Sequence, residues 1–115
     1  MKVPDPIQWQ DFNKIDLRIG TIIEANDFRE AREPAYILRV DFGNDIGIKK
    51  SSAQITDHYS KEELIGKQIV AVVNFPPKQI GPIMSECLIT GFYRSGSEVV
   101  LAVPDHKVPN GARLR

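Results

Sequence analysis

Residues 68–75 (QIVAVVNF) form the most strongly patterned segment of the chain. Its β-branched residues fall on both faces of an extended backbone: Ile69, Val70, Val72 and Val73. Such residues favour strands, and a strand that is apolar on both faces is usually covered on both sides. Pro76 and Pro77 follow directly and end the pattern. We therefore expect a central β-strand, which requires partner strands from elsewhere in the chain.

Shorter segments with the two-residue period of a strand supply those partners. We expect them over residues 17–26, 36–42, 46–50, 87–93 and 99–103. The inward face of the second consists of Tyr36, Leu38, Val40 and Phe42. Turn residues at 95–97 (Ser-Gly-Ser) make the last two strands a hairpin. Gly20, inside the first strand, indicates a β-bulge or a bend in a barrel.

Two short helices are also predicted. Asp5 and Pro6 suit an N-cap followed by the first helical position, so a helix should cover residues 7–13. Ser60 and Glu63 have the spacing of a capping box, in which each side chain satisfies a backbone donor of the other residue. The helix that this box begins lies between the third and fourth strands.

This inventory predicts an all-β fold. About five strands with a helix between the third and the fourth is the order of a five-stranded OB-fold barrel. A Greek-key sandwich is the competing architecture. The 115 residues fit a single domain, 1–115, in which residues 1–14 form an N-terminal helical extension.

The residues that enzymes commonly use are almost absent. The glycines form neither a phosphate-binding loop nor a dinucleotide-binding motif, and there is no Cys-x-x-Cys or His-x-x-x-His pair. His58 and His106 are the only histidines, which leaves too few ligands for structural zinc. Cys87 lies in an apolar strand, where cysteine is usually an inert buried residue. We expect no catalytic residue, no metal and no cofactor.

The expected location is the cytoplasm. No apolar run reaches the roughly 18 residues that a membrane span requires. Residues 1–6 lack the apolar stretch of a signal peptide. Cys87 is the only cysteine and cannot form an internal disulfide, which suits a reducing compartment.

The distribution of charge is more informative than its sum. Fifteen basic residues balance fifteen acidic ones, which argues against a strongly basic nucleic-acid-binding protein. Two windows nevertheless contain no Asp or Glu: residues 46–56, with Lys49 and Lys50, and residues 64–85, with Lys67 and Lys78. If the fold brings these windows together, a neutral protein presents a positive patch. The alternative is that these are ordinary solvated lysines.

Three segments carry more polarity than folding requires. Residues 49–52 (Lys-Lys-Ser-Ser) offer cations and hydroxyls to phosphate oxygens. Residues 74–78 offer an amide, an aromatic face and a lysine, which could hold a base and its phosphate. Residues 85–86 (Ser-Glu) offer a carboxylate that could accept from a base or orient a lysine. The alternatives are a solvated strand end, a core Phe75 beside an exposed lysine, and the polar tip of a hairpin.

These segments also resemble a known family. Residues 15–22 (IDLRIGTI), 70–78 (VAVVNFPPK) and 85–88 (SECL) are similar to the tRNA-binding domain that is appended to methionyl- and phenylalanyl-tRNA synthetases. The resemblance is closer to the CsaA-type branch of that family. Its matching segments are residues 31–36, 41–43, 47–56, 63–66 and 108–111.

The resemblance implies an OB barrel and a homodimer whose terminal segments help to build the interface. Ile7, Trp9 and Phe12 are the candidate interface residues, unless they cover the open end of their own barrel. It also implies tRNA binding by shape, and CsaA-type proteins are described as export-related chaperones of unfolded preproteins. The candidate RNA-binding residues are Lys49, Lys50, Ser51, Ser52, Asn74, Lys78, Ser85 and Glu86. A chaperone that binds polypeptides, with RNA binding secondary, is the alternative function.

Overall fold

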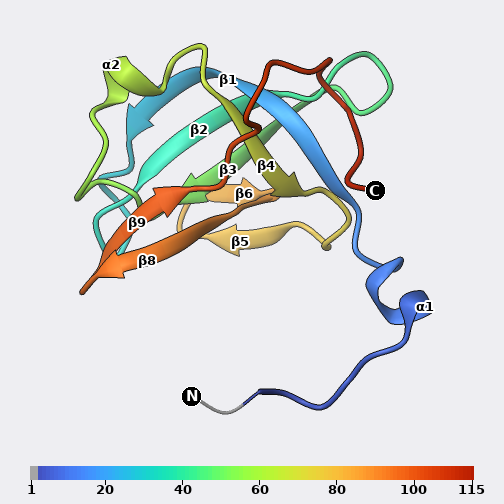
Figure 1. Cartoon of the computed structure of the whole chain (residues 1–115). Coiled ribbons are helices and arrows are strands. Elements are labelled where there is room, and N and C mark those ends of the chain that lie inside the picture. The colour runs from blue at the N-terminus through green and yellow to red at the C-terminus, as the bar shows by residue number, and fades with distance from the viewer. Residues whose placement is uncertain (1–2) are drawn as a thin grey trace.

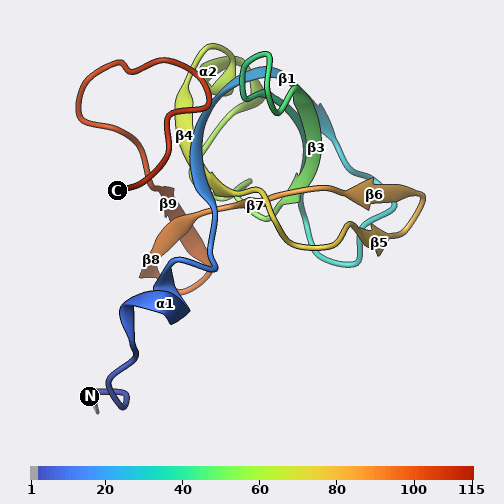
Figure 2. The ribbon, with the colours of Figure 1, turned by 90° about the vertical axis from the view of Figure 1, so that its right-hand side faces the viewer.

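A curled five-stranded antiparallel sheet forms the body of the protein. The computed structural model describes residues 3–115; Met1 and Lys2, which the predicted domain and its extension include, lie outside the described residues. The sheet has the order β3-β2-β1-β4-β7 and closes almost completely into a barrel, seen along its axis in Figure 2. Its strands are β1 (Leu17–Asp27), β2 (Tyr36–Asp41), β3 (Ile48–Ala53), β4 (Gln68–Val72) and β7 (Leu88–Ile89).

Short elements surround this barrel (Figure 1). Helix α2 (Lys61–Leu64) lies between β3 and β4, and helix α1 (Trp9–Phe12) precedes β1. Two hairpins follow β4, formed by β5 (Lys78–Ile80) with β6 (Ile83–Ser85) and by β8 (Gly91–Ser95) with β9 (Glu98–Leu101). The predicted all-β, five-stranded barrel with its two short helices is therefore confirmed, in preference to a sandwich. Within residues 3–115, neither helix has the length or the apolar character to cross a membrane.

The core lies inside the barrel. The four residues predicted to point inward are all buried: Tyr36, Leu38 and Val40 of β2, and Phe42, which follows the strand. Ile22 from β1, Leu64 from α2 and Ile69 from β4 complete the interior. Strand β4 pairs with β1 on one side and with β7 on the other, as expected of a central strand.

Gly20 leaves room for this core. A Cβ atom on Gly20 would lie 2.5 Å from Val40 Cγ1 and 2.7 Å from the Phe42 ring. The irregularity in β1 falls between Ile22 and Glu24, so Gly20 does not form the β-bulge. It precedes Thr21, the residue at which β1 changes its neighbour from β4 to β2. Gly20 therefore permits close packing where the strand passes from one side of the barrel to the other.

The first helix begins later than its sequence predicts. The predicted N-cap at Asp5 is wrong, because α1 starts at Trp9 with Gln8 as its N-cap residue. The reason is local: the Asp11 carboxylate accepts a hydrogen bond from the Gln8 backbone N–H at 3.0 Å. Residues 3–8 instead lead away from the barrel (Figures 1 and 2). At α2 the expected cap is present, since the Glu63 N–H donates to Ser60 Oγ at 3.3 Å.

The C-terminal segment returns along β1. The Ile19 N–H donates to the Ala112 carbonyl at 2.9 Å, and the Gly111 N–H donates to the Ile19 carbonyl at 2.7 Å. The Leu114 N–H then donates to the Leu17 carbonyl at 2.9 Å. These bonds lie along the first residues of β1, before the part of the strand that pairs with β2. They also bring the end of the chain next to the N-terminal extension.

Candidate functional site

Polar side chains close the barrel between β3 and the segment before β7. Lys50 and Glu86 exchange two bonds: the Glu86 N–H donates to the Lys50 carbonyl at 2.7 Å, and the Lys50 N–H donates to Glu86 Oε1 at 2.9 Å. The Ser52 N–H donates to Ser85 Oγ at 3.2 Å. Ser85 and Glu86, which the sequence suggests as RNA contacts, thus satisfy the backbone of β3.

Ser51 belongs to the core. Only 1% of its surface is exposed, and its hydroxyl donates to the Cys87 carbonyl at 2.9 Å. Its side chain cannot reach a ligand outside the barrel, so we remove it from the candidate RNA contacts. The sequence could not reveal this, because serine is usually a surface residue and its partner lies 36 residues away.

The two adjacent lysines of β3 diverge. Side chains alternate along a strand, so Lys49 shares the face of Ser51 and Lys50 shares the outward face of Ser52. Lys49 lies close enough to Cys87 for its charge to favour ionisation of that thiol. Lys50 stands beside Arg39 of β2, its partner in the sheet. The two cations therefore flank the end of the barrel from different faces.

The Asn74 side chain links two segments of the chain by hydrogen bonds. Its Oδ1 accepts from the Asp16 N–H at 2.9 Å, and its Nδ2 donates to the Lys14 carbonyl at 2.6 Å. Both ends of the amide are thus engaged. The expected strand over 68–75 ends early, at Val72, and the Val73 N–H donates to the Asp16 carbonyl instead of to a sheet partner.

A hollow of about 380 Å³ lies where β3 meets the β5–β6 hairpin, a size typical of ligand pockets. Three of the predicted contacts line it, namely Ser52, Lys78 and Ser85. The rest of its lining consists of Phe75, Pro76, Ile80, Cys87 and Leu88. No carboxylate of residues 3–115 lines it. The sequence pattern missed Ile80 and Leu88, because the strands that carry them have only two or three residues and show no period.

The two windows without acidic residues meet at this hollow. Strand β3 comes from the first window and packs against β6 from the second. Lys49, Lys50 and Lys78 form no ion pair among residues 3–115. Cations of β1 and β8 are paired, as Arg18 is with Asp16 and Arg94 with Glu98. The lysines beside the hollow therefore keep their charge available for an external anion.

Cys87 forms the floor of the hollow rather than a nucleophile. Burial raises the pKa of its thiol from the ordinary value of 9.0 to about 11, so the thiol stays protonated at neutral pH. His58 has partners in Glu98 and Arg94, and His106 has a partner in Asp105. Among residues 3–115, no group of three or more His, Cys, Asp or Glu residues is placed to hold a metal ion.

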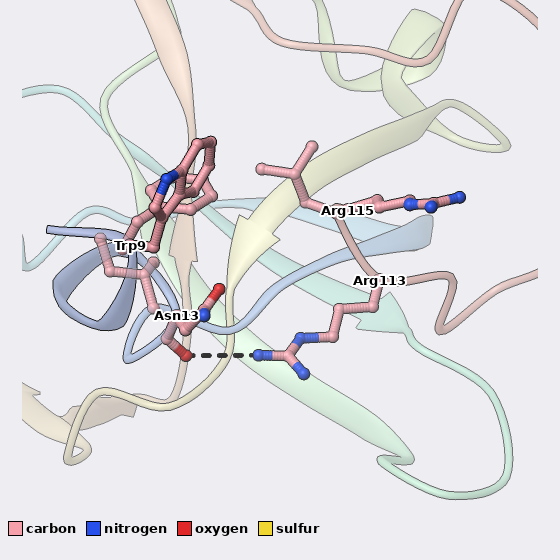
Figure 3. A pocket seen from close by; sticks show the side chains of 7 residues that line it. Trp9, Asn13, Arg113 and Arg115 are labelled. Atoms are coloured by element: carbon pink, nitrogen blue, oxygen red, sulfur yellow. Dashed lines mark hydrogen bonds between the residues drawn. The ribbon is translucent and has the colours of Figure 1, made fainter.

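A larger hollow, of about 700 Å³, separates the N-terminal extension from the C-terminal segment. Figure 3 shows Trp9 and Asn13 on one side and Arg113 and Arg115 on the other, with Arg113 donating to the Asn13 carbonyl at 3.4 Å. Trp9 is 83% exposed, and Ile7 just before it is 66% exposed. The alternative that these two side chains cover their own barrel is therefore wrong.

Known proteins share this fold. The family model described as a putative tRNA binding domain matches residues 17–113. The crystal structure of chaperone CsaA from Bacillus anthracis has 49% sequence identity and a TM-score of 0.91, and the match covers 96% of this chain and 100% of that one. For the CsaA chaperone protein of Picrophilus torridus the identity is 52% and the TM-score 0.88, with the same coverage.

Longer proteins contain a similar segment. The methionine–tRNA ligase of Thermococcus onnurineus is 33% identical over 109 residues, which are 95% of this chain. The chain spans only 14% of the length of that ligase.

Proposed function

This chain belongs to the putative tRNA-binding domain family, as a CsaA-type member, and from that premise we propose that it is a non-catalytic homodimer that binds tRNA by shape and phosphate contacts. One observation carries the proposal: Ser52 and Lys78 line a hollow that no carboxylate of residues 3–115 lines, and Lys49 and Lys50 lie on β3, the strand that carries Ser52. Lys49, Lys50, Ser52 and Lys78 are here called the lysine surface. Cations without acidic partners are suited to phosphate oxygens, which supply most of the affinity in nucleic-acid binding.

The balanced net charge is compatible with this role. Glu86 is the acidic residue next to the lysine surface, and its carboxylate accepts from the Lys50 backbone N–H. Glu24 and Asp27 of β1 pair with other cations, Arg39 and Lys61. Lys49, Lys50 and Lys78 form no ion pair among residues 3–115, so they can form a local positive patch although the protein as a whole is neutral. Contacts to phosphates do not distinguish one base sequence from another. We therefore propose recognition by shape. A cytoplasmic location, where tRNA is found, is part of the proposal.

A polypeptide-binding chaperone with an export-related role is the second candidate. The two CsaA proteins named above are described as chaperones. Phe75 and Leu88 at the hollow are each about half exposed, and exposed apolar surface of this kind can bind unfolded preproteins. RNA binding would then be secondary.

A tRNA titration at two salt concentrations, with an unfolded preprotein as competitor, separates these functions. We expect the tRNA affinity to fall steeply between about 50 and 200 mM salt, because each phosphate contact releases counterions. Displacement of tRNA by the preprotein would place both ligands on one surface. Absence of tRNA binding even at the lower salt concentration, together with salt-independent suppression of preprotein aggregation, would leave the chaperone as the function.

The proposed dimer uses the N-terminal extension. Ile7 and Trp9 are large apolar side chains that the chain's own barrel does not cover, and Phe12 lines the larger hollow together with Trp9. Apolar and aromatic residues of this kind are typical of the centre of an interface. A dimer would present the lysine surface twice, and two linked weak contacts bind one RNA more tightly than a single contact does.

Replacing Ile7 and Trp9 together with serine tests the dimer. We expect the mass in solution, measured by light scattering, to fall from that of a dimer to that of a monomer, because the apolar anchors are removed. The Ile48→Ser variant, which removes an exposed apolar residue of β3, is the control and should remain dimeric. A monomeric mass for the unchanged protein would refute this interface.

A further inference from the structure

The hollow beside the lysine surface is more apolar than phosphate binding requires. Phe75, Pro76, Ile80 and Leu88 form most of its wall, and Lys78 stands at its edge with the hydroxyl groups of Ser52 and Ser85. Phosphate contacts alone would need the cations but not this wall. A ligand that fits both parts has a flat apolar face, polar edges and a negative charge.

We propose that the hollow holds one unpaired nucleotide of the bound RNA, with its base stacked on Phe75 and its phosphate at Lys78. This inference rests on the proposed tRNA binding and adds a preference for single-stranded positions. Proteins that read RNA often hold splayed-out bases against aromatic side chains, because paired bases offer no free face. Phe75 is 54% exposed and lines the hollow, so a base can reach its ring.

Phe75 is held in place from both sides. On its N-terminal side, Asn74 bonds to the backbone of Lys14 and Asp16 through both ends of its amide. On its C-terminal side, the chain is restricted by Pro76 and Pro77. A platform that is already rigid loses little conformational entropy when a base stacks on it. The fixed position of the ring therefore favours stacking.

Two polar groups of the hollow come from the two strands of the β5–β6 hairpin. Lys78 of β5 pairs in register with Ser85 of β6, so the ammonium and the hydroxyl belong to neighbouring positions. Ser85 Oγ accepts from the Ser52 N–H and keeps its own proton to donate. A base edge can accept that proton while the adjacent phosphate meets Lys78.

The contacts of β3 argue against an extended polypeptide that pairs with this strand. A peptide that joins a sheet must bond to a free strand edge. The edge of β3 that faces the hollow is already engaged, since Lys50 exchanges two bonds with Glu86 and the Ser52 N–H donates to Ser85. The hollow still offers an aromatic face, hydroxyl groups and a cation, Lys78, that pairs with no acid among residues 3–115.

Binding of a short fluorescent single-stranded RNA, compared with an RNA duplex of the same length, tests this proposal by anisotropy. In the Phe75→Leu variant we expect the single strand to bind about 5- to 150-fold more weakly, the range for removal of one base–aromatic stack. The duplex should bind as it does to the unchanged protein. Phe75→Trp should restore the single-strand affinity, because the larger ring also stacks.

Phe92→Leu is the matched control, since Phe92 is an exposed aromatic residue on β8 that does not line the hollow. Unchanged single-strand affinity in Phe75→Leu, or equal weakening of single strand and duplex, would overturn the nucleotide pocket. So would a loss of unfolded-preprotein binding in that variant with RNA binding intact, which would make the hollow a polypeptide site. If whole tRNA does not bind the unchanged protein, the proposed function itself fails; if it does, only the pocket is at stake.

Discussion

Replacing Gly20 with valine is expected to destabilise the protein by roughly 3 kcal/mol or more, at the upper end of the cost of overpacking a core. Even a single Cβ atom would lie 2.5 Å from Val40 Cγ1 and 2.7 Å from the Phe42 ring, and the branched side chain adds two further methyl groups. Val40 and Phe42 are fully buried. Urea unfolding followed by circular dichroism measures the decrease in the free energy of unfolding.

A double variant separates overpacking from other causes. Gly20→Val combined with Val40→Ala should be less destabilised than the sum of the two single variants, because the alanine removes the nearest clashing atom. Gly20 does not adopt a positive φ, so backbone strain does not contribute. An unfolding midpoint equal to that of the unchanged protein would mean that the core is not packed as described.

Changing Lys49, Lys50 and Lys78 together to alanine is expected to weaken tRNA binding roughly a hundredfold at physiological salt. Each lysine that neutralises a phosphate contributes through the counterions it releases, and three such lysines account for an effect of that size. The dependence of affinity on salt should become shallower by roughly one unit of slope for each phosphate that is no longer neutralised. All tRNAs should be affected alike, since phosphate contacts do not read bases.

The control is a variant with the same change in net charge. Lys14, Lys61 and Lys107 lie outside the lysine surface, and the first two already pair with Asp11 and Asp27. Alanine at these three positions should leave the tRNA affinity within a few-fold of the unchanged protein. An equal loss of affinity in both triple variants would show that total charge, and not this surface, governs binding.

The strands and the core were predictable because their signal is local. The alternation over residues 36–42 identifies the inward side chains, and the β-branched run identifies the strand with neighbours on both sides. The sequence predicted a positive patch only on the condition that the fold brings the two windows without acidic residues together. That condition is met because β3 and β6 are adjacent, a relation between segments that are distant in the chain, as Ser52 and Ser85 are.

The individual roles of the site residues depend on such distant relations. Asn74 is committed to the backbone of Lys14 and Asp16, and Ser51 to the Cys87 carbonyl. The sequence around Asn74 and Ser51 does not indicate these hydrogen-bond partners. Ile80 and Leu88 of the pocket wall were missed for a related reason, since β5 and β7 are too short for a period to appear.

The return of the C-terminal segment along β1 has a consequence for the order in which the protein can be made. Arg18 of the first strand donates to the Gly111 carbonyl, 93 residues later in the chain, and the backbone of Ile19 bonds to the same segment. During synthesis these bonds to β1 cannot form until almost the whole domain has left the ribosome. Non-local pairing of this kind makes folding slower than local contacts would. The bonds along the first strand are therefore among the last to be completed.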